Sequence, residues 1–245
     1  MSKTIAIFGA GTGLGLAAAR RFGREGYCVA LVGRRREALD ALVTELAADA
    51  IDATAFPADL GLTAQIPALL SAITERYGSI DVVQYAPITL EPFIAAADLT
   101  TEVMQGFVNL YLLTPIQILR EVLPGMIERG FGGIFIGQGG SAINAAPFAS
   151  GLGPAMAAAR NYLHSLHGEI ADKGVYAGAL TVNGMIAGSA AHQAITSGEL
   201  TLNLPEGFAF PTVDPADLAD GLWDLLTKRD RVEITYPETD PTSAS

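Results

Sequence analysis

Apolar and amphipathic segments alternate along the whole chain. Short apolar runs predict buried strands at 3–8, 28–33, 53–56, 80–85, 132–137, 176–182 and 232–236. Segments with apolar residues three and four positions apart predict helices at 13–25, 36–48, 63–77, 100–128, 152–172 and 215–227. Because strand and helix alternate throughout, the pattern predicts an α/β fold, a doubly wound parallel sheet with helices on both faces.

One domain over residues 1–236 accounts for this pattern. Residues 187–211, rich in Ala, Ser and Gly, interrupt the alternation and predict a flexible substrate loop, since such segments often close over a ligand at the strand ends. An ordinary surface loop is the alternative. The polar tail 237–245 is expected to be disordered. Since no apolar run reaches about 18 residues, we expect no membrane span.

Composition narrows the classes of partner. The 245 residues carry a net charge of −11, which argues against nucleic acid or an anionic membrane as the main partner. A single cysteine rules out an internal disulfide, and three scattered histidines give no sign of a metal site. The first predicted strand starts at residue 3, so we expect no signal peptide and a cytoplasmic protein.

A glycine-rich turn follows the first predicted strand. Gly9, Gly13 and Gly15, with Gly11, Thr12 and Leu14 between them, lead directly into a predicted helix. Glycines let the backbone approach a ligand, and the free N–H groups and dipole of a helix N-terminus favour negative charge. The segment predicts a pyrophosphate cradle, with a plain structural turn as the alternative.

The second predicted strand ends at Gly33-Arg34-Arg35 without an acidic residue. An acid there would bind the ribose hydroxyls of NAD and disfavour a 2′-phosphate. A guanidinium instead presents a planar cationic fork to a phosphate. We therefore expect NADP(H) in preference to NAD(H), with Arg34 on the 2′-phosphate and Arg35 in support.

Over nearly its whole length the chain resembles the short-chain dehydrogenase/reductase family. The resemblance implies a Rossmann-type fold and assigns cofactor contacts to the glycine turn, to an Asp-Leu pair after the third strand and to one residue after the fourth strand. It also assigns one to Ile186, in the segment Asn183–Ile186, where family members usually have a Pro-Gly turn beside the nicotinamide. It also aligns an asparagine inside the fourth helix with a helix asparagine of the family. The matching positions are Gly9, Gly13, Gly15, Asp59, Leu60, Ala86, Asn109 and Ile186.

The family's usual catalytic residues are missing. Family members use a tyrosine, a lysine four residues later and an upstream serine. The resemblance aligns Leu152 with the tyrosine and Met156 with the lysine, and it brings glycines to the serine position with Ser141 next to them. Residues 131–161 contain neither tyrosine nor lysine. Asn109 and Ser141 remain as candidate catalytic residues, and the chain is placed in a divergent branch.

Each remaining polar candidate has a structural alternative. Ser141 either contacts the substrate or is a loop hydroxyl. Asn109 either belongs to a proton relay or satisfies backbone groups at a helix kink. Tyr85, at the end of the fourth predicted strand, either touches ligand or is a packed aromatic.

Three functions are compatible with this sequence. The first is an NADP(H)-dependent oxidoreductase acting on a small, mostly apolar carbonyl or alkene. The second is an NADP(H)-binding protein without catalysis, a sensor or scaffold, because a cradle is retained where the reaction centre is lost. The third is a lyase or isomerase on the same fold. The resemblance further implies a homodimer or homotetramer built on helices 100–128 and 152–172.

Overall fold

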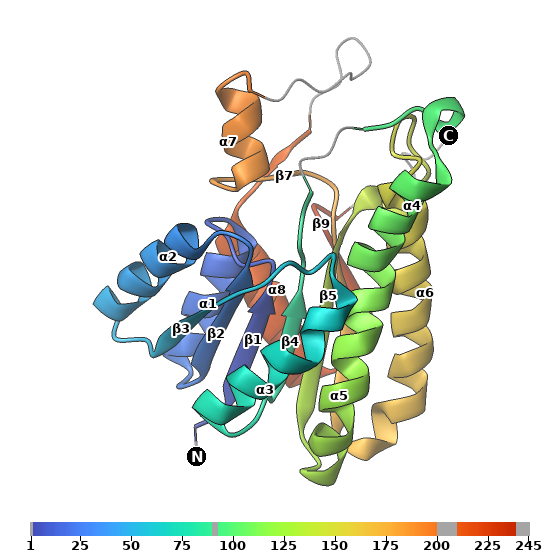
Figure 1. Ribbon diagram of the computed structural model, residues 1–245. Helices are drawn as coiled ribbons and strands as arrows, with labels where there is room; N and C mark the ends of the chain where they lie inside the picture. Colours follow the sequence, from blue (N-terminus) through green and yellow to red (C-terminus); the bar gives the residue numbers. More distant parts are fainter. Residues whose placement is uncertain (1, 90–92, 200–209, 239–245) are drawn as a thin grey trace.

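The computed structural model describes residues 2–89, 93–199 and 210–238. Within these residues a seven-stranded parallel sheet has the order β3-β2-β1-β4-β5-β6-β9, and β7 pairs with β8 in a separate two-stranded sheet (Figure 1). The predicted α/β fold is confirmed. The strands are β1 Thr4–Phe8, β2 Cys28–Gly33, β3 Ala53–Pro57, β4 Val82–Tyr85, β5 Gly132–Gly139, β6 Val175–Val182, β7 Met185–Ile186, β8 Thr212–Val213 and β9 Glu233–Tyr236.

Helices cover both faces of the large sheet (Figure 1). Side chains alternate along β1, so that Ile5 and Ile7 pack under α1, α2 and α8, whereas Ala6 and Phe8 pack under α3, α5 and α6. The α-helices are α1 Leu14–Arg24, α2 Arg36–Ala48, α3 Ile66–Tyr77, α4 Thr101–Val108, α5 Thr114–Glu128, α6 Leu152–Ile170, α7 Ala190–Thr196 and α8 Pro215–Lys228. Short 3₁₀ turns lie at Thr63–Gln65, Ala96–Asp98, Gly140–Ala142 and Ala171–Lys173.

The carboxyl ends of the strands meet at one edge of the sheet. Phe8 is in register with Tyr85, and Gly139 is in register with Val182. Gly9, directly after β1, has a φ of +88°. A Cβ at this position would lie 2.5 Å from the Cα of Pro87, so neither the dihedral nor the space admits another residue. This edge is where ligands bind in open α/β sheets.

The helix predicted over 100–128 is interrupted by a π-helical turn at Asn109–Leu113. The Thr114 N–H bonds to the Asn109 carbonyl, and Pro115 has no N–H, so the Leu110 carbonyl loses its donors within the helix. The Tyr85 hydroxyl donates to that carbonyl from β4. Burial raises the pKa of Tyr85 well above its ordinary value, so the hydroxyl keeps its proton.

The segment predicted as a flexible loop, 187–211, contains a helix. The Ser189 hydroxyl accepts a hydrogen bond from the His192 N–H at 3.1 Å and caps α7, which ends at Thr196. Residues 190–196 therefore form a short helix inside the predicted loop. The sequence marks its start by the serine and not by a strong apolar pattern. Residues 200–209 of the predicted loop and 239–245 of the predicted tail lie outside the described residues.

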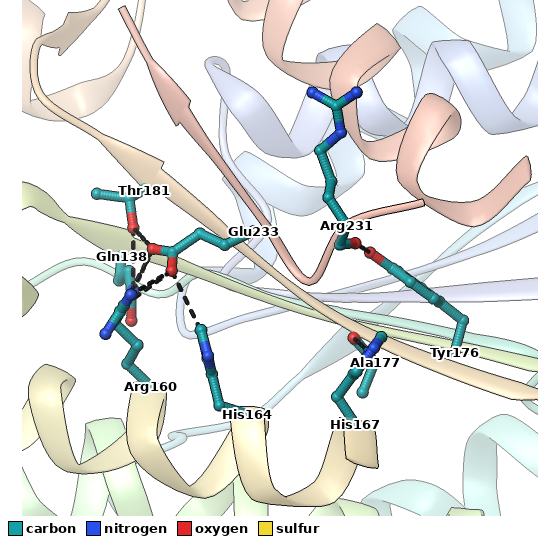
Figure 2. A network of polar contacts seen from close by, with 9 residues as sticks. All are labelled: Gln138, Arg160, His164, His167, Tyr176, Ala177, Thr181, Arg231 and Glu233. Carbon is teal, nitrogen blue, oxygen red and sulfur yellow. Dashed lines mark hydrogen bonds and ion pairs between the residues drawn. The ribbon is translucent and has the colours of Figure 1, made fainter. Parts of the chain in front are cut away.

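A partly buried ion pair joins β9 to α6 (Figure 2). The Glu233 side chain, 12% exposed, accepts from Arg160 Nε and Nη2 at 2.9 and 2.6 Å. The Thr181 hydroxyl donates to Glu233 at 2.7 Å, and His164 Nε2 lies 3.1 Å from the same carboxylate. Burial acts to raise the pKa of Glu233, but the hydrogen bonds from Arg160 and Thr181 outweigh it and hold that pKa below the ordinary 4.5.

Replacement of this carboxylate should weaken the fold in a pH-dependent way. Because the pKa of Glu233 is lower in the folded state, its stabilisation is present above pH 4.5 and is lost as the pH falls through the folded-state pKa. Glu233→Gln should lower the free energy of unfolding by roughly 1–3 kcal/mol at neutral pH, and less in acid. Urea titrations from pH 3 to pH 7 measure this.

The matched control is Glu45→Gln, since Glu45 pairs with Arg20 at the surface. Such pairs contribute about 0–1 kcal/mol. Equal losses in the two variants, or a Glu233→Gln loss that does not vary with pH, would contradict the analysis.

Removal of the Tyr85 hydroxyl should destabilise the fold at the π turn. Tyr85→Phe leaves the Leu110 carbonyl without its donor and should cost about 1–3 kcal/mol of unfolding free energy, measured by thermal and urea unfolding. Tyr162→Phe is the comparison, because the Tyr162 hydroxyl makes no hydrogen bond in the part of the chain that the structure describes. The two variants should differ; matching stabilities would show that the π turn does not need Tyr85.

Candidate functional site

The glycine turn presents unused backbone N–H groups. α1 begins at Leu14, and its N-cap Gly13 offers no side chain. Among the described residues, the N–H groups of Gly11 through Gly15 donate no hydrogen bond. An N-terminus with several unpaired donors and a helix dipole favours an anion, which is the property that a pyrophosphate cradle needs.

Close packing shapes the turn on one side and leaves it open on the other. A Cβ on Gly15 would lie 3.0 Å from the Ala10 Cα, and one on Gly13 would lie 3.2 Å from Ile186 Cγ2 and 3.0 Å from Ser189 Cβ. Around Gly11, by contrast, no described atom lies within 4 Å of that position. The turn therefore fits the close approach of a pyrophosphate at Gly11.

The segment after β6 lies over the glycine turn. The Thr12 hydroxyl donates to the Gly188 carbonyl at 2.6 Å, and Ile186 belongs to β7, next to Gly13. The Gln193 amide donates to the same Gly188 carbonyl at 3.0 Å. Two of the predicted cofactor residues, Thr12 and Ile186, thus hold the segment after β6 against the glycine turn.

Arg34 and Arg35 stand free beside the turn. The Val32 carbonyl accepts from the N–H groups of Gly9 and Ala10 at 2.9 and 2.8 Å, which brings the end of β2 against the glycine turn. Arg34 and Arg35 are exposed and form no ion pair with any described residue, whereas Arg36 pairs with Asp40 at 3.1 Å. The two free guanidinium groups can therefore take an anionic group of a ligand.

The remaining predicted cofactor residues are also at this edge. Asp59 is exposed, and its Oδ1 accepts from the Gly61 N–H at 2.9 Å. Leu60 is buried, and its carbonyl accepts from the Thr114 hydroxyl at 2.6 Å. Ala86 lies after β4 between two glycines: a Cβ on Gly137 would lie 2.7 Å from its own Cβ, and one on Gly9 would lie 2.9 Å from its carbonyl carbon.

The predicted reaction centre is largely apolar. Met156, 8% exposed, packs with Phe107, Tyr111 and the partly buried Leu152. Ser141 lies against the first turn of α6, with its Oγ 3.6 Å from where a Gly153 Cβ would be and 3.9 Å from where a Gly139 Cβ would be. The two residues aligned with the family's tyrosine and lysine therefore belong to one hydrophobic cluster.

Asn109 lies at the start of the π turn, and its Oδ1 accepts from the Gln105 side chain at 2.8 Å. Tyr85 is 2% exposed with its hydroxyl on Leu110, so it is the packed aromatic of the two alternatives. Among the described residues, no cluster of three or more His, Cys, Asp or Glu side chains could hold a metal ion. Nor is any described helix long and apolar enough to cross a membrane.

One polar side chain at the centre was not among the sequence candidates. Asn183 follows β6, and a Cβ on Gly140 would overlap its Oδ1 atom. The signal in the sequence was the replacement of the family's usual Pro-Gly turn by Asn183-Gly184. Only the fold shows that the asparagine side chain faces Gly140.

Comparison with known proteins agrees with this geometry. The model of the short chain dehydrogenase family matches residues 3–198. The oxidoreductase asL5 of Sarocladium schorii is 32% identical over 71% of this chain and 68% of its own length. A fatty acyl-CoA reductase of Mycobacterium tuberculosis is 33% identical over 54% of this chain, but the chain spans only 45% of that protein.

The fold is also that of solved structures. A variant of actinorhodin polyketide ketoreductase with NADPH superimposes with a TM-score of 0.80 at 23% identity, covering 96% of this chain and 95% of the other. Since the family match covers most of the chain, the protein belongs to the short-chain dehydrogenase/reductase family of oxidoreductases.

Proposed function

We propose that the protein binds NADP(H) and reduces a small, mostly apolar carbonyl or alkene. The observation that carries the cofactor proposal is the pair of free guanidinium groups of Arg34 and Arg35 beside an open turn of unused N–H groups. The turn would hold the pyrophosphate, Arg34 the 2′-phosphate with Arg35 in support, and Asp59 with Leu60 the adenine ring. Ala86 and Ile186 would line the inner part of the cofactor site.

The apolar character of the centre supports the substrate class. Leu152 and Met156 offer no charge, and three large apolar side chains near the centre, Phe93, Ile143 and Phe148, are 43%, 43% and 42% exposed. A bridge between Ile94 and Ala149 brings two of the segments that carry them side by side. Phe148 has a φ of +64°, an uncommon conformation for a bulky residue and one that is frequent at ligand sites.

The chemistry divides between cofactor, solvent and chain. NADPH, when bound, would supply a hydride, and water would supply the proton, so that a carbonyl becomes an alcohol and the cofactor becomes NADP⁺. The residues of this chain would orient the carbonyl and exclude competing water, with Ser141 contacting the substrate and Asn109 holding the helix beside it. Loss of a positioned acid typically costs ~10²–10⁴ in rate, so we expect slow turnover.

A second function, NADP(H) binding without catalysis as a sensor or scaffold, is favoured by one observation. Met156, aligned with the family's lysine, is buried among aromatic rings and offers no hydrogen bond to a ribose. NADPH absorbance at 340 nm, followed with a panel of C2–C8 ketones, aldehydes and enals, separates the two. Consumption that depends on substrate supports the reductase, and binding without consumption supports the sensor.

We also propose a homodimer or homotetramer, as the resemblance implies. A groove of about 500 Å³ between α5 and α6 supports this, because its lining is mainly apolar. The lining residues are the apolar or aromatic Leu119, Leu123, Pro124, Ile127 and Tyr162 together with the charged Arg120 and Glu128.

Arg34→Ala should weaken NADPH far more than NADH. Loss of charge-assisted hydrogen bonds to a 2′-phosphate costs roughly 1.5–3 kcal/mol, which is about a tenfold to hundredfold rise in the Kd for NADPH. Arg36→Ala, which removes a paired arginine two residues away, is the control and should change neither Kd. Fluorescence titrations with both nucleotides measure the effect. If Arg34→Ala changes both nucleotides equally, the 2′-phosphate role is wrong.

Leu123→Glu should dissociate the assembly. Association would remove this carboxylate from water in a groove lined mainly by apolar side chains, which opposes association. Light scattering coupled to size exclusion should then give the monomer mass for the variant and a multiple of it for the wild type. A monomeric wild type, or a variant that keeps the wild-type mass, contradicts the proposal.

A further inference from the structure

The end of β6 carries a polar side chain that has no hydrogen-bond partner among the described residues. The Asn183 N–H donates to the Tyr236 carbonyl at 2.6 Å, which ties the backbone to β9. The next residue, Gly184, is enclosed: a Cβ there would lie 2.6 Å from the Pro211 carbonyl oxygen. The Asn183 carboxamide itself makes no hydrogen bond within the described ranges, and the residue is only partly buried. A carboxamide has two donors and an acceptor to offer, and no described residue takes a hydrogen bond from these donors.

Gly140 and Asn183 fit together as a pair. The neighbouring residues Gly139 and Val182 are in register across β5 and β6, so the two strand ends lie side by side. A Cβ on Gly140 would overlap the Oδ1 of Asn183, whereas one on Gly139 would meet its nearest atom only at 3.9 Å. The absence of a side chain at 140 therefore creates the space that the carboxamide fills.

The carboxamide is thereby brought into an otherwise apolar centre. The turn Gly140–Ala142 connects it to Ser141, whose backbone and side chain lie against Gly153 in the first turn of α6, next to Leu152. Leu152 and Met156, at the positions aligned with the family's tyrosine and lysine, carry no hydrogen-bond donor. A polar substrate atom here needs a donor, since an unpaired buried carbonyl costs free energy.

We infer that Asn183 is a catalytic residue whose side-chain carboxamide donates a hydrogen bond to the carbonyl oxygen of the substrate. It exchanges no proton and forms no covalent bond. Its contribution is to fix the carbonyl and to stabilise negative charge that develops on the oxygen during reduction, as preorganised amide donors do elsewhere. This inference rests on the proposed reductase function.

The test is a double-mutant cycle between Asn183→Ala and Gly140→Ala. Asn183→Ala removes the donor and should lower kcat/KM for the best ketone or aldehyde of the panel by about tenfold to a hundredfold. Gly140→Ala keeps the asparagine but displaces its carboxamide, so it should cause a similar loss. In the Asn183→Ala background the space is empty, and Gly140→Ala should then have little further effect.

Two further measurements separate this role from a structural one. In Asn183→Ala, the Kd for NADPH should stay within twofold of the wild-type value. The melting temperature should stay within a few degrees of wild type. Gly168→Ala, a glycine in α6 with no described atom within 4 Å of the new Cβ, is the matched control and should leave kcat/KM unchanged.

The outcomes are distinct. Wild-type turnover that Asn183→Ala leaves intact, or additive effects of the two substitutions, overturns the inference and leaves the reductase proposal standing. NADPH binding by the wild type without turnover of any carbonyl overturns both. Loss of NADPH affinity in Asn183→Ala by more than tenfold would place the carboxamide on the cofactor instead, and this inference would be wrong.

Discussion

Close backbone packing at the carboxyl edge of the sheet is the constraint on which the site depends. Gly9 approaches Pro87, Gly137 approaches Ala86, and Gly140 makes room for Asn183. Each contact joins the ends of two neighbouring strands, and none leaves space for a Cβ. The absence of side chains therefore brings the glycine turn, the end of β4 and the end of β6 into one surface that a nucleotide can lie on.

The chain combines an open glycine turn with a largely apolar group of residues at the positions aligned with the family's tyrosine and lysine. At the glycine turn, the backbone N–H groups and the guanidinium groups of Arg34 and Arg35 have no partner among the described residues. Unpaired donors are costly when buried, but at a solvent-exposed edge water can bond to them. At the second group, Met156 is buried in a hydrophobic cluster and the partly buried Leu152 packs against it, so polar side chains there lie outside that cluster. Binding and chemistry can thus diverge separately within one fold.

Features that depend on residues close together in the sequence could be predicted, whereas contacts between residues far apart in the sequence could not. The strands and most helices follow from local hydrophobic patterns, and the glycine turn from local spacing. The π turn has a local cause in Pro115, but the hydrogen bond to its Leu110 carbonyl comes from Tyr85, 25 residues away. The contact between Gly140 and Asn183 joins the ends of two strands that are 43 residues apart in the sequence. The start of α7 is marked in the sequence only by the capping Ser189. Residue types predict such contacts only after the topology is known.

The ion pair of Glu233 on β9 also affects whether the edge of the sheet pairs with a strand of another molecule. In the described residues β9 is the last strand of the sheet, so its outer backbone groups could pair with a strand from another molecule. Glu233 directs a charge inward beneath α6, while Ile234 packs on the opposite face. A slip of one residue would exchange these two faces and bury a carboxylate among leucines. The charge that stabilises this strand therefore also fixes its register and discourages edge-to-edge aggregation.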